Sequence, residues 1–149
     1  MGYLFSGRYE YAIDDKGRLS VPAKFRDILS ANYDMKLILT NLDGCLAAYP
    51  DKEWTDVQQR FAESGSMKRE SRAFLRFFFA GASECPIDRL GRILIPQSLR
   101  NYAGIKKNVV IVGMNKKIEI WSEEAWAGVV EQATSDLEKM IDIASDLGL

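Results

Sequence analysis

Two arginines, Arg18 and Arg92, are the side chains of this sequence best suited to binding a polyanion. Each follows a glycine directly, and each lies four residues after an aspartate, Asp14 or Asp88. A guanidinium can bind a phosphate through two parallel N–H groups or read guanine O6 and N7 in the DNA major groove, and lysine does this less well. These residue types therefore indicate recognition of a nucleic acid.

The two arginines belong to a motif that occurs twice, over residues 14–26 and 88–100. Both copies read Asp-x-x-Gly-Arg-aliphatic-x-aliphatic-Pro-x-x-apolar-Arg, without a gap. So many coincident positions are not expected by chance. The chain is therefore predicted to contain two structural repeats.

The first residues of each motif predict a tight turn. Asp14 or Asp88 caps a type I turn through its side chain, and Gly17 or Gly91 accepts a positive φ. Such a turn usually joins the two strands of a hairpin, so the chain should reverse in each motif. In this interpretation the aspartates also orient the arginines, which stand at the exposed end of each hairpin.

Other basic residues surround the two turns. Lys16 and Arg89 lie inside the turns and extend the basic edge that Arg18 and Arg92 begin. The helices that follow the motif prolines add three further candidates for phosphate contact: Lys24, Arg26 and Arg100. For Arg26 and Arg100, covering the core is as good an interpretation as contact with a phosphate.

Other roles for these residues stay open from the sequence. Arg18 and Arg92 could pair with Asp14 and Asp88, within a subunit or across a subunit boundary, and serve only to hold the fold. The basic edge could instead dock an acidic protein, which would make the chain an assembly or interaction module. An enzyme is disfavoured, because the candidate carboxylates lie in solvent-facing turns where nothing should shift their pKa.

The composition excludes several classes of site. The sequence has no histidine, which removes Ser-His-Asp and Cys-His catalytic sites and His-based zinc sites. Its two cysteines, Cys45 and Cys85, are too few for a disulfide framework and are typical of buried thiols in a cytosolic protein. We predict no catalytic residue, no metal, no cofactor and no small-molecule substrate.

The charges are unevenly distributed along the chain although the formal net charge is −1. Acidic residues gather after residue 122, whereas residues 88–121 carry an excess of bases, and such local fields steer polyanions. The composition, 47% hydrophobic and 28% charged, is globular. Since no apolar run approaches the ~18–20 residues of a membrane span, we expect no membrane partner. A cytoplasmic, nucleoid-associated location is expected of a chain that binds DNA.

Hydrophobic periodicity and turn signals predict similar elements in both repeats. Strands are expected over 3–13, 18–21, 35–40 and 45–49, and again over 82–87, 92–95, 107–112 and 117–121. Helices are expected over 22–30, from Pro50 onward, over 67–80 after a cap at Ser66, over 96–102, and as one long amphipathic helix over 122–147. The corresponding domains are a first repeat at 1–55, connecting helices at 50–81 and a second repeat at 82–126.

Each repeat is too small to bury a core alone, so the two must share one. We therefore predict an α+β fold in which two tandem half-barrel repeats interleave as a single pseudo-twofold β-barrel with flanking helices.

The paired Asp-x-x-x-Arg motifs, set in Gly-Arg-Leu-Ser-Val-Pro and Gly-Arg-Ile-Leu-Ile-Pro, resemble the bacterial MraZ family, as does the opening Phe5-Ser6-Gly7. That family is similar to the AbrB/SpoVT transition-state regulators, with both halves in one chain. The resemblance implies two AbrB/SpoVT-like half-barrels, a ring-shaped homo-oligomer, and binding to short repeats of double-stranded DNA. Those repeats lie in the promoter of the division and cell-wall gene cluster that contains the family's own gene. It also assigns DNA contact to Arg18 and, in the second repeat, to Arg92.

Overall fold

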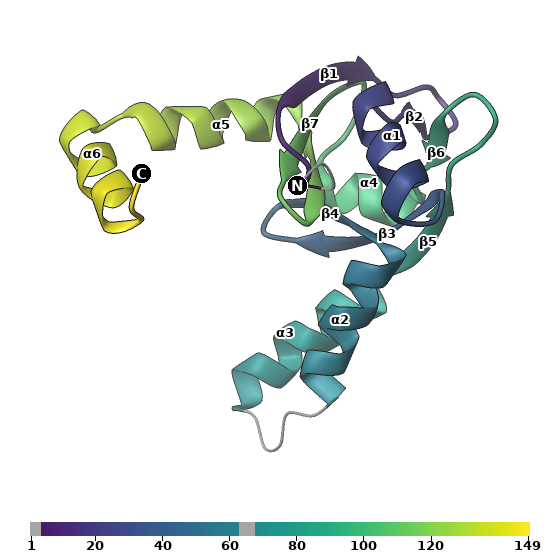
Figure 1. The fold of residues 1–149 in the computed structure, drawn as a ribbon, viewed down its shortest axis with the longest axis horizontal. Coiled ribbons are helices and arrows are strands. Elements are labelled where there is room, and N and C mark those ends of the chain that lie inside the picture. The colour runs from purple at the N-terminus through teal and green to yellow at the C-terminus, as the bar shows by residue number, and fades with distance from the viewer. Residues whose placement is uncertain (1–3, 63–67) are drawn as a thin grey trace.

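The structure is a computed structural model that describes residues 4–62 and 68–149 (Figure 1). The helix break expected at 63–66, with its cap at Ser66, lies outside the described residues. None of the described helices combines the length and the apolar content that crossing a bilayer requires.

Six strands form one antiparallel sheet in the order β1-β7-β8-β4-β3-β5. They are β1 (Arg8–Ala12), β3 (Lys36–Leu42), β4 (Cys45–Pro50), β5 (Ser83–Pro86), β7 (Asn108–Met114) and β8 (Lys117–Ser122). The aliphatic runs of the two repeats form the hairpins β3–β4 and β7–β8. At the tip of the first hairpin, Asp43 and Gly44 have φ values of 58° and 79°, as a type I′ turn requires.

The remaining strands, β2 (Arg18–Ser20) and β6 (Arg92–Leu94), pair with each other as a separate two-stranded ribbon. The expectation of a hairpin within each motif is therefore wrong. Both turns are present, but β1 pairs with β7 and β5 pairs with β3. The strand after each turn pairs only with its counterpart from the other repeat, so the repeats are interleaved through the ribbon.

The strands of the described residues do not form the single closed barrel that the sequence predicts. Strands β1 and β5 are the two edges of the sheet, and the β2–β6 ribbon is joined to these edges through the two motif turns without a continuous ladder. The fold is thus α+β, with two repeats, an open six-stranded sheet and a crossing ribbon.

The ribbon closes the main core from one side. Leu19 and Ile93 face each other across the ribbon, and each is only 1% exposed. They pack in one apolar cluster with Phe25 and Leu99, which come from the helices of the two motifs. These helices are α1 (Ala23–Asn32) and α4 (Gln97–Ala103), and each begins directly after a motif proline, where the missing N–H costs nothing.

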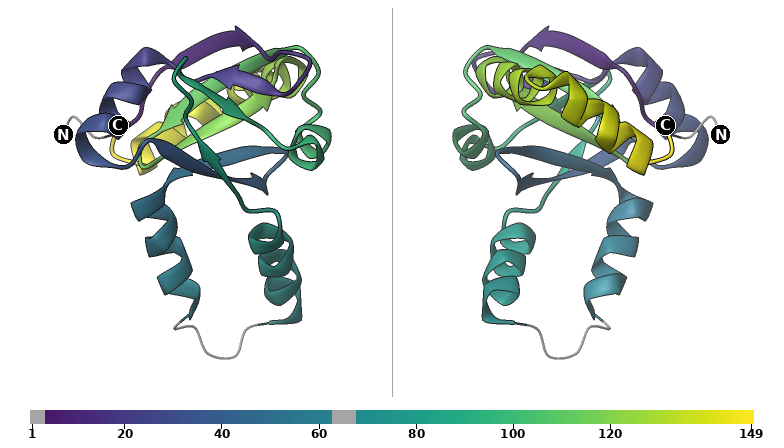
Figure 2. Two further views of the ribbon diagram at one scale, coloured as in Figure 1. Left: turned by 90° about the vertical axis from the view of Figure 1, so that its right-hand side faces the viewer. Right: turned by 90° about the vertical axis from the view of Figure 1, so that its left-hand side faces the viewer.

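Helices α2 (Asp51–Ala62) and α3 (Arg69–Ala80) connect the repeats and project from the body as two arms (Figure 2). Where they leave the sheet, Trp54 and Phe78 pack with Ile38 in a second apolar cluster. Of the phenylalanines in α3 only Phe78 is buried, so most of the aromatic surface of this helix stays outside the core.

The C-terminal region contains two helices where the sequence predicts one. Helix α5 (Glu123–Thr134) is capped by Ser122, whose hydroxyl accepts the N–H of Ala125. Helix α6 (Leu137–Asp146) has its own cap at Asp136, whose carboxylate accepts the N–H of Lys139. Because Asp136 satisfies a donor at a new helix start, the apolar stripe is divided between two helices. Both extend away from the body (Figure 1).

Shortening a side chain on the buried face of strand β6 should lower stability, whereas the same change on its exposed face should not. We expect Ile93→Ala to lower the free energy of unfolding by about 2–5 kcal/mol, because it opens a cavity under the ribbon. The neighbouring Leu94→Ala is the matched control, since Leu94 is 58% exposed, and should change stability by no more than about 0.5 kcal/mol. Urea denaturation of both variants measures the difference, and equal losses would show that the ribbon does not seal the core.

Candidate nucleic-acid interface

The register of the ribbon divides its side chains between two faces. Arg18 pairs with Leu94 and Ser20 pairs with Arg92, while the central pair points into the core. Directly opposed residues of an antiparallel pair lie on the same face, and neighbours along a strand alternate. Arg18, Ser20, Arg92 and Leu94 therefore share the surface that faces away from the core, which we call the outer ribbon face.

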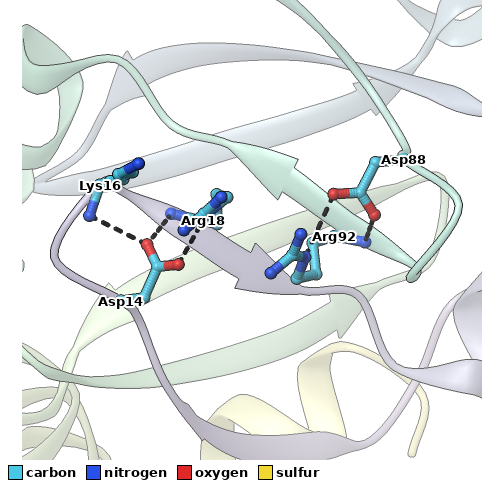
Figure 3. Close-up of polar contacts among 5 residues, drawn as sticks. All are labelled: Asp14, Lys16, Arg18, Asp88 and Arg92. Atoms are coloured by element: carbon cyan, nitrogen blue, oxygen red, sulfur yellow. Dashed lines mark hydrogen bonds and ion pairs between the residues drawn. The ribbon is translucent and has the colours of Figure 1, made fainter.

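Each arginine of the outer ribbon face is held by the aspartate that opens its own motif (Figure 3). Nε of Arg18 donates to Oδ2 of Asp14 at 2.7 Å, and Nε of Arg92 donates to Oδ2 of Asp88 at 3.1 Å. Within the described part of the chain, no hydrogen bond engages the terminal nitrogens of either guanidinium. Each guanidinium is thus fixed at its inner edge, with its outer nitrogens available to a ligand.

The second oxygen of each aspartate caps the turn. Oδ1 of Asp14 accepts the backbone N–H of Lys16 at 3.0 Å and that of Arg18 at 2.8 Å. Oδ1 of Asp88 accepts the matching N–H groups of Leu90 and Arg92, both at 2.9 Å. One carboxylate therefore fixes both the turn and the guanidinium beside it.

These hydrogen bonds lower the pKa of both carboxyls. The backbone N–H of Arg18 is the main reason that the pKa of Asp14 falls to about 2. The backbone N–H of Arg92 likewise lowers the pKa of Asp88. The expectation that nothing shifts these pKa values is wrong, and the direction of the shift keeps both groups ionised, which does not suit a general acid or base at neutral pH.

The guanidiniums of Arg26 and Arg100 each lie against a turn of the other repeat. Nε of Arg26 donates to the Val21 carbonyl at 3.1 Å, and its guanidinium lies against Gly91 in the other repeat. Arg100 occupies the equivalent position: its Nε donates to the carbonyl of Ile95 at 3.0 Å, and its guanidinium lies against Gly17. Both arginines therefore cover a buried turn glycine of the opposite repeat.

The other predicted basic residues are exposed at the periphery of the ribbon. Because β2 and β6 are antiparallel and each turn precedes its strand, the two turns lie at opposite ends of the ribbon. Lys16 is in the turn before β2, Arg89 is in the turn before β6, and both are exposed, as is Lys24 in the first turn of α1. Lys16, Arg18, Arg92 and Arg89 thus follow one another along a single basic strip.

Sequence reasoning missed two members of the outer ribbon face, Ser20 and Leu94. The signal that could have found them is the alternation within the short strands, in which a buried Leu19 or Ile93 stands between two outward positions. Exposed Leu90 was also missed, and because it lies in the second turn the strand alternation does not indicate it.

The two halves of the strip differ in character. The first motif places Lys16 and Ser20 where the second places Leu90 and Leu94. These leucines are 72% and 58% exposed, so the second motif adds apolar surface where the first motif is cationic and polar. Leu94 lies opposite Arg18 and Ser20 lies opposite Arg92, so each end of the ribbon combines residues of both motifs.

The cysteines do not provide a reactive site. Burial raises the pKa of Cys45 to about 12 and that of Cys85 to about 11, so both thiols stay protonated and unreactive at neutral pH. Among the described residues, no three His, Cys, Asp or Glu side chains lie together in a way that could hold a metal ion.

Comparison with known proteins gives consistent matches over both repeats. The sequence model of the MraZ protein family matches residues 4–77 and again residues 78–143. A curated relative from Desulforamulus reducens, named "Transcriptional regulator MraZ", is 42% identical over 144 residues, which cover 97% of this chain and 99% of the relative. Relatives of the same name are 44% identical in Caldicellulosiruptor saccharolyticus, over 98% of this chain and 100% of the relative, and 44% identical in Moorella thermoacetica, over 93% and 98%.

Replacing Gly17 or Gly44 with alanine should distinguish the stability lost to backbone strain from the stability lost to a clash between the repeats. Gly17 and Gly44 have φ values of 91° and 79°, so alanine at either costs about 1–2 kcal/mol. A Cβ at Gly17 would lie 2.8 Å from the Arg100 guanidinium carbon and 2.8 Å from the Ile95 carbonyl oxygen, whereas at Gly44 it meets nothing within 4 Å. Gly17→Ala should therefore cost at least about 1 kcal/mol more than Gly44→Ala in urea denaturation. Equal losses would contradict a tight fit of Arg100 on this turn.

Acidification should weaken the fold through the two turn carboxylates. The pKa of Asp14 is lower in the folded chain, about 2 against a usual 3.8, so its stabilising effect is complete above about pH 4 and is lost as the pH falls toward 2. Asp14→Asn removes this contribution, so the variant should be less stable at pH 6 and should lose less stability between about pH 4 and pH 2. Denaturation at a series of pH values measures this, and parallel curves for the two proteins would contradict it.

Proposed function

The chain belongs to the MraZ family, and from this premise we propose that it is a DNA-binding transcriptional regulator. The name of the curated relatives supports the functional class. The outer ribbon face supports the mode of binding, because it presents one arginine from each repeat on one short, rigid element.

The observation that carries this proposal is the way the two guanidiniums are held. An Arg–Asp pair that used both terminal nitrogens would leave little for a ligand, but Asp14 and Asp88 engage Nε. The outer nitrogens of Arg18 and Arg92 can therefore make the paired contact with guanine O6 and N7 or with a phosphate. Because the aspartates already restrict the arginine side chains, less side-chain conformational entropy is lost on binding.

A two-stranded ribbon is an element that can enter a DNA groove. The major groove of B-DNA is about 12 Å wide and admits a two-stranded β-ribbon. With the outer ribbon face toward the bases, Ser20 can exchange hydrogen bonds with them and Leu94 can contact a thymine methyl group. Lys16 and Arg89, at the two ends of the strip, are then placed to reach phosphates, which fix position and not sequence.

One copy of this strip offers few phosphate contacts, so its affinity for a single site should be modest. We propose that several copies assemble as a ring and bind short repeats in the promoter of the division and cell-wall gene cluster, including the gene for this chain. Repeated sites gain affinity through effective concentration when their spacing matches that of the subunits. A regulator of this kind would work in the cytoplasm, on the nucleoid.

A basic strip could also dock an acidic protein, and salt titration distinguishes the two partners. Binding to duplex DNA releases counterions, so the logarithm of the affinity should fall linearly and steeply with the logarithm of salt concentration. Preference for promoter repeats over scrambled DNA of the same length would then be expected only of a regulator.

Arg18→Ala should weaken binding to the DNA upstream of the chain's own gene by about 5–150-fold, since a good arginine–base contact contributes about 1–3 kcal/mol. Fluorescence anisotropy at fixed salt measures the affinity, and light scattering should show an unchanged mass. Arg18→Lys should recover only part of the loss, because lysine keeps the charge without the two parallel donors.

The matched control is Lys52→Ala, which removes an exposed base from α2 and should leave the affinity unchanged. Arg92→Ala tests the second repeat in the same assay. Wild-type affinity in Arg18→Ala, with the assembly intact, would contradict the proposal and assign Arg18 to the fold alone.

A further inference from the structure

A hollow of about 740 Å³, which we call the β5 hollow, lies between strand β5 and the ribbon. Its main lining residues are Ser83, Cys85 and Pro86 from β5, and Arg18, Arg92 and Leu94 from the ribbon. The hollow forms because β5 is an edge of the main sheet and β6 pairs with β2 instead of with β5. Its volume lies in the range of small-molecule sites, about 300–1,000 Å³.

The equivalent positions of the first repeat carry larger side chains. Tyr9 and Tyr11 of β1 precede their motif aspartate by the same distances as Ser83 and Cys85 of β5 precede theirs. Both tyrosines pack against the main core, and the ring of Tyr9 lies 5.2 Å from that of Phe25. The small side chains of β5 therefore leave room beside the ribbon that aromatic rings fill on β1.

Both arginines of the outer ribbon face line the β5 hollow. Arg18 and Arg92 are diagonal neighbours across the ribbon, because Arg18 pairs with Leu94 and Arg92 lies two residues before Leu94. Diagonal neighbours are about 7–8 Å apart, a distance that long side chains can bridge. Figure 3 shows the two arginines over the ribbon, between the two aspartates. A single anion in the hollow can thus accept N–H groups from both.

The acids of the β5 hollow are already engaged. The carboxylate of Asp88 accepts hydrogen bonds from Nε of Arg92 and from two backbone N–H groups, and Glu84 pairs with Nζ of Lys36 at 3.1 Å. The outer nitrogens of Arg18 and Arg92, by contrast, have no hydrogen-bond partner within the described part of the chain. The hollow therefore offers charged donors to a ligand, and such donors suit an anion.

The rest of the lining is largely apolar. Leu94 is 58% exposed, and Pro86, Pro96 and Cys85 extend the apolar wall. A ligand body placed against this wall would remove apolar surface from water, which favours binding. Charged donors beside an apolar wall fit a ligand in which an anionic group is joined to an apolar body.

We propose that the β5 hollow is a regulatory site for a small phosphate monoester with an aromatic body. The phosphate binds the outer nitrogens of Arg18 and Arg92, because its several oxygens can accept paired N–H groups from two guanidiniums. The aromatic body lies against Leu94 and the two prolines. Since the ligand uses the same nitrogens that would contact DNA, the two exclude each other. This regulatory role rests on the proposed function, whereas binding of the ligand does not.

Isothermal titration calorimetry on the full-length chain without DNA tests the site, with phenyl phosphate as the probe. Phenyl phosphate should bind about tenfold more tightly than inorganic phosphate, because only the ester has a body that covers the apolar wall. Arg18→Ala and Arg92→Ala should each weaken the binding of phenyl phosphate about tenfold or more, since each removes hydrogen bonds to a charged group.

Ser83→Tyr is the variant that separates the hollow from the DNA interface, because it gives β5 the side chain that β1 carries at the equivalent position. The added ring should fill the hollow and weaken the binding of phenyl phosphate about tenfold or more. Affinity for promoter DNA should stay within about twofold, since Ser83 is not part of the outer ribbon face. The matched control is Gln58→Tyr, at an exposed position of α2, which should change neither affinity.

Glu84→Gln provides a second variant with the opposite expected effect. Glu84 is an exposed acid in the lining of the hollow, so its replacement by the uncharged amide removes a charge that repels the phosphate. The binding of phenyl phosphate should become about two- to fivefold tighter. Because the substitution exchanges side chains of the same shape on the surface, it should leave the thermal midpoint nearly unchanged.

Competition tests the regulatory role. Phenyl phosphate should displace promoter DNA from the wild-type chain in fluorescence anisotropy, with an inhibition constant equal to its calorimetric Kd. DNA bound to Ser83→Tyr should resist displacement, and phenol, which lacks the phosphate, should displace DNA from neither protein.

Three results would overturn the proposed site: phenyl phosphate that binds no better than inorganic phosphate, wild-type binding in Arg18→Ala, or wild-type binding in Ser83→Tyr. Binding of phenyl phosphate without displacement of DNA would overturn the regulatory role. Failure of this inference is distinct from failure of the proposed function. A chain that binds promoter DNA but not phenyl phosphate contradicts only the site, and a chain that binds phenyl phosphate but not DNA contradicts only the regulator.

Discussion

The pairing of β2 with β6 is the contact on which the rest of the structure depends. Each motif supplies one strand, and reciprocal hydrogen bonds continue the pairing at both ends: the Val21 N–H donates to the Gly91 carbonyl at 2.9 Å, and the Ile95 N–H donates to the Gly17 carbonyl at 2.8 Å. The ribbon also carries the apolar pair that seals the core. Neither repeat can therefore complete its core or its turn without the other, so the two small repeats share one core.

The same crossing explains the composition of the repeated motif. Its opening aspartate fixes the arginine that follows the glycine, and its closing arginine covers the glycine of the opposite motif. A side chain on that glycine would collide with the covering guanidinium, so the glycine is required by packing as well as by its positive φ. Different arginines of one motif thus serve the fold and the proposed DNA contact: Arg26 and Arg100 cover the turns, whereas Arg18 and Arg92 face outward.

Sequence reasoning found the features set by local chemistry and missed those set by pairing between distant segments. The aspartate–glycine turns, the helices after the prolines and the aliphatic hairpins follow from short-range rules. A turn signal, however, does not determine which strand its flanks pair with, so the β2–β6 exchange was not predicted. Covering the core was one of two interpretations for Arg26 and Arg100, but their contact with the turn of the opposite repeat was not predicted. At the C-terminus the long apolar stripe favoured one helix, and the local cap at Asp136 prevailed over it.

The ribbon is nearly symmetric, but its departures from symmetry matter for recognition. A true twofold surface would suit a palindromic site, because each half would read the same bases. Here Lys16 and Leu94 lie at the end of the ribbon that carries Arg18, whereas Leu90 and Ser20 lie at the end that carries Arg92. A duplex docked on the strip therefore has a preferred direction. The ribbon thus fixes the two arginines, and their unequal neighbours fix the orientation of a duplex bound there as proposed.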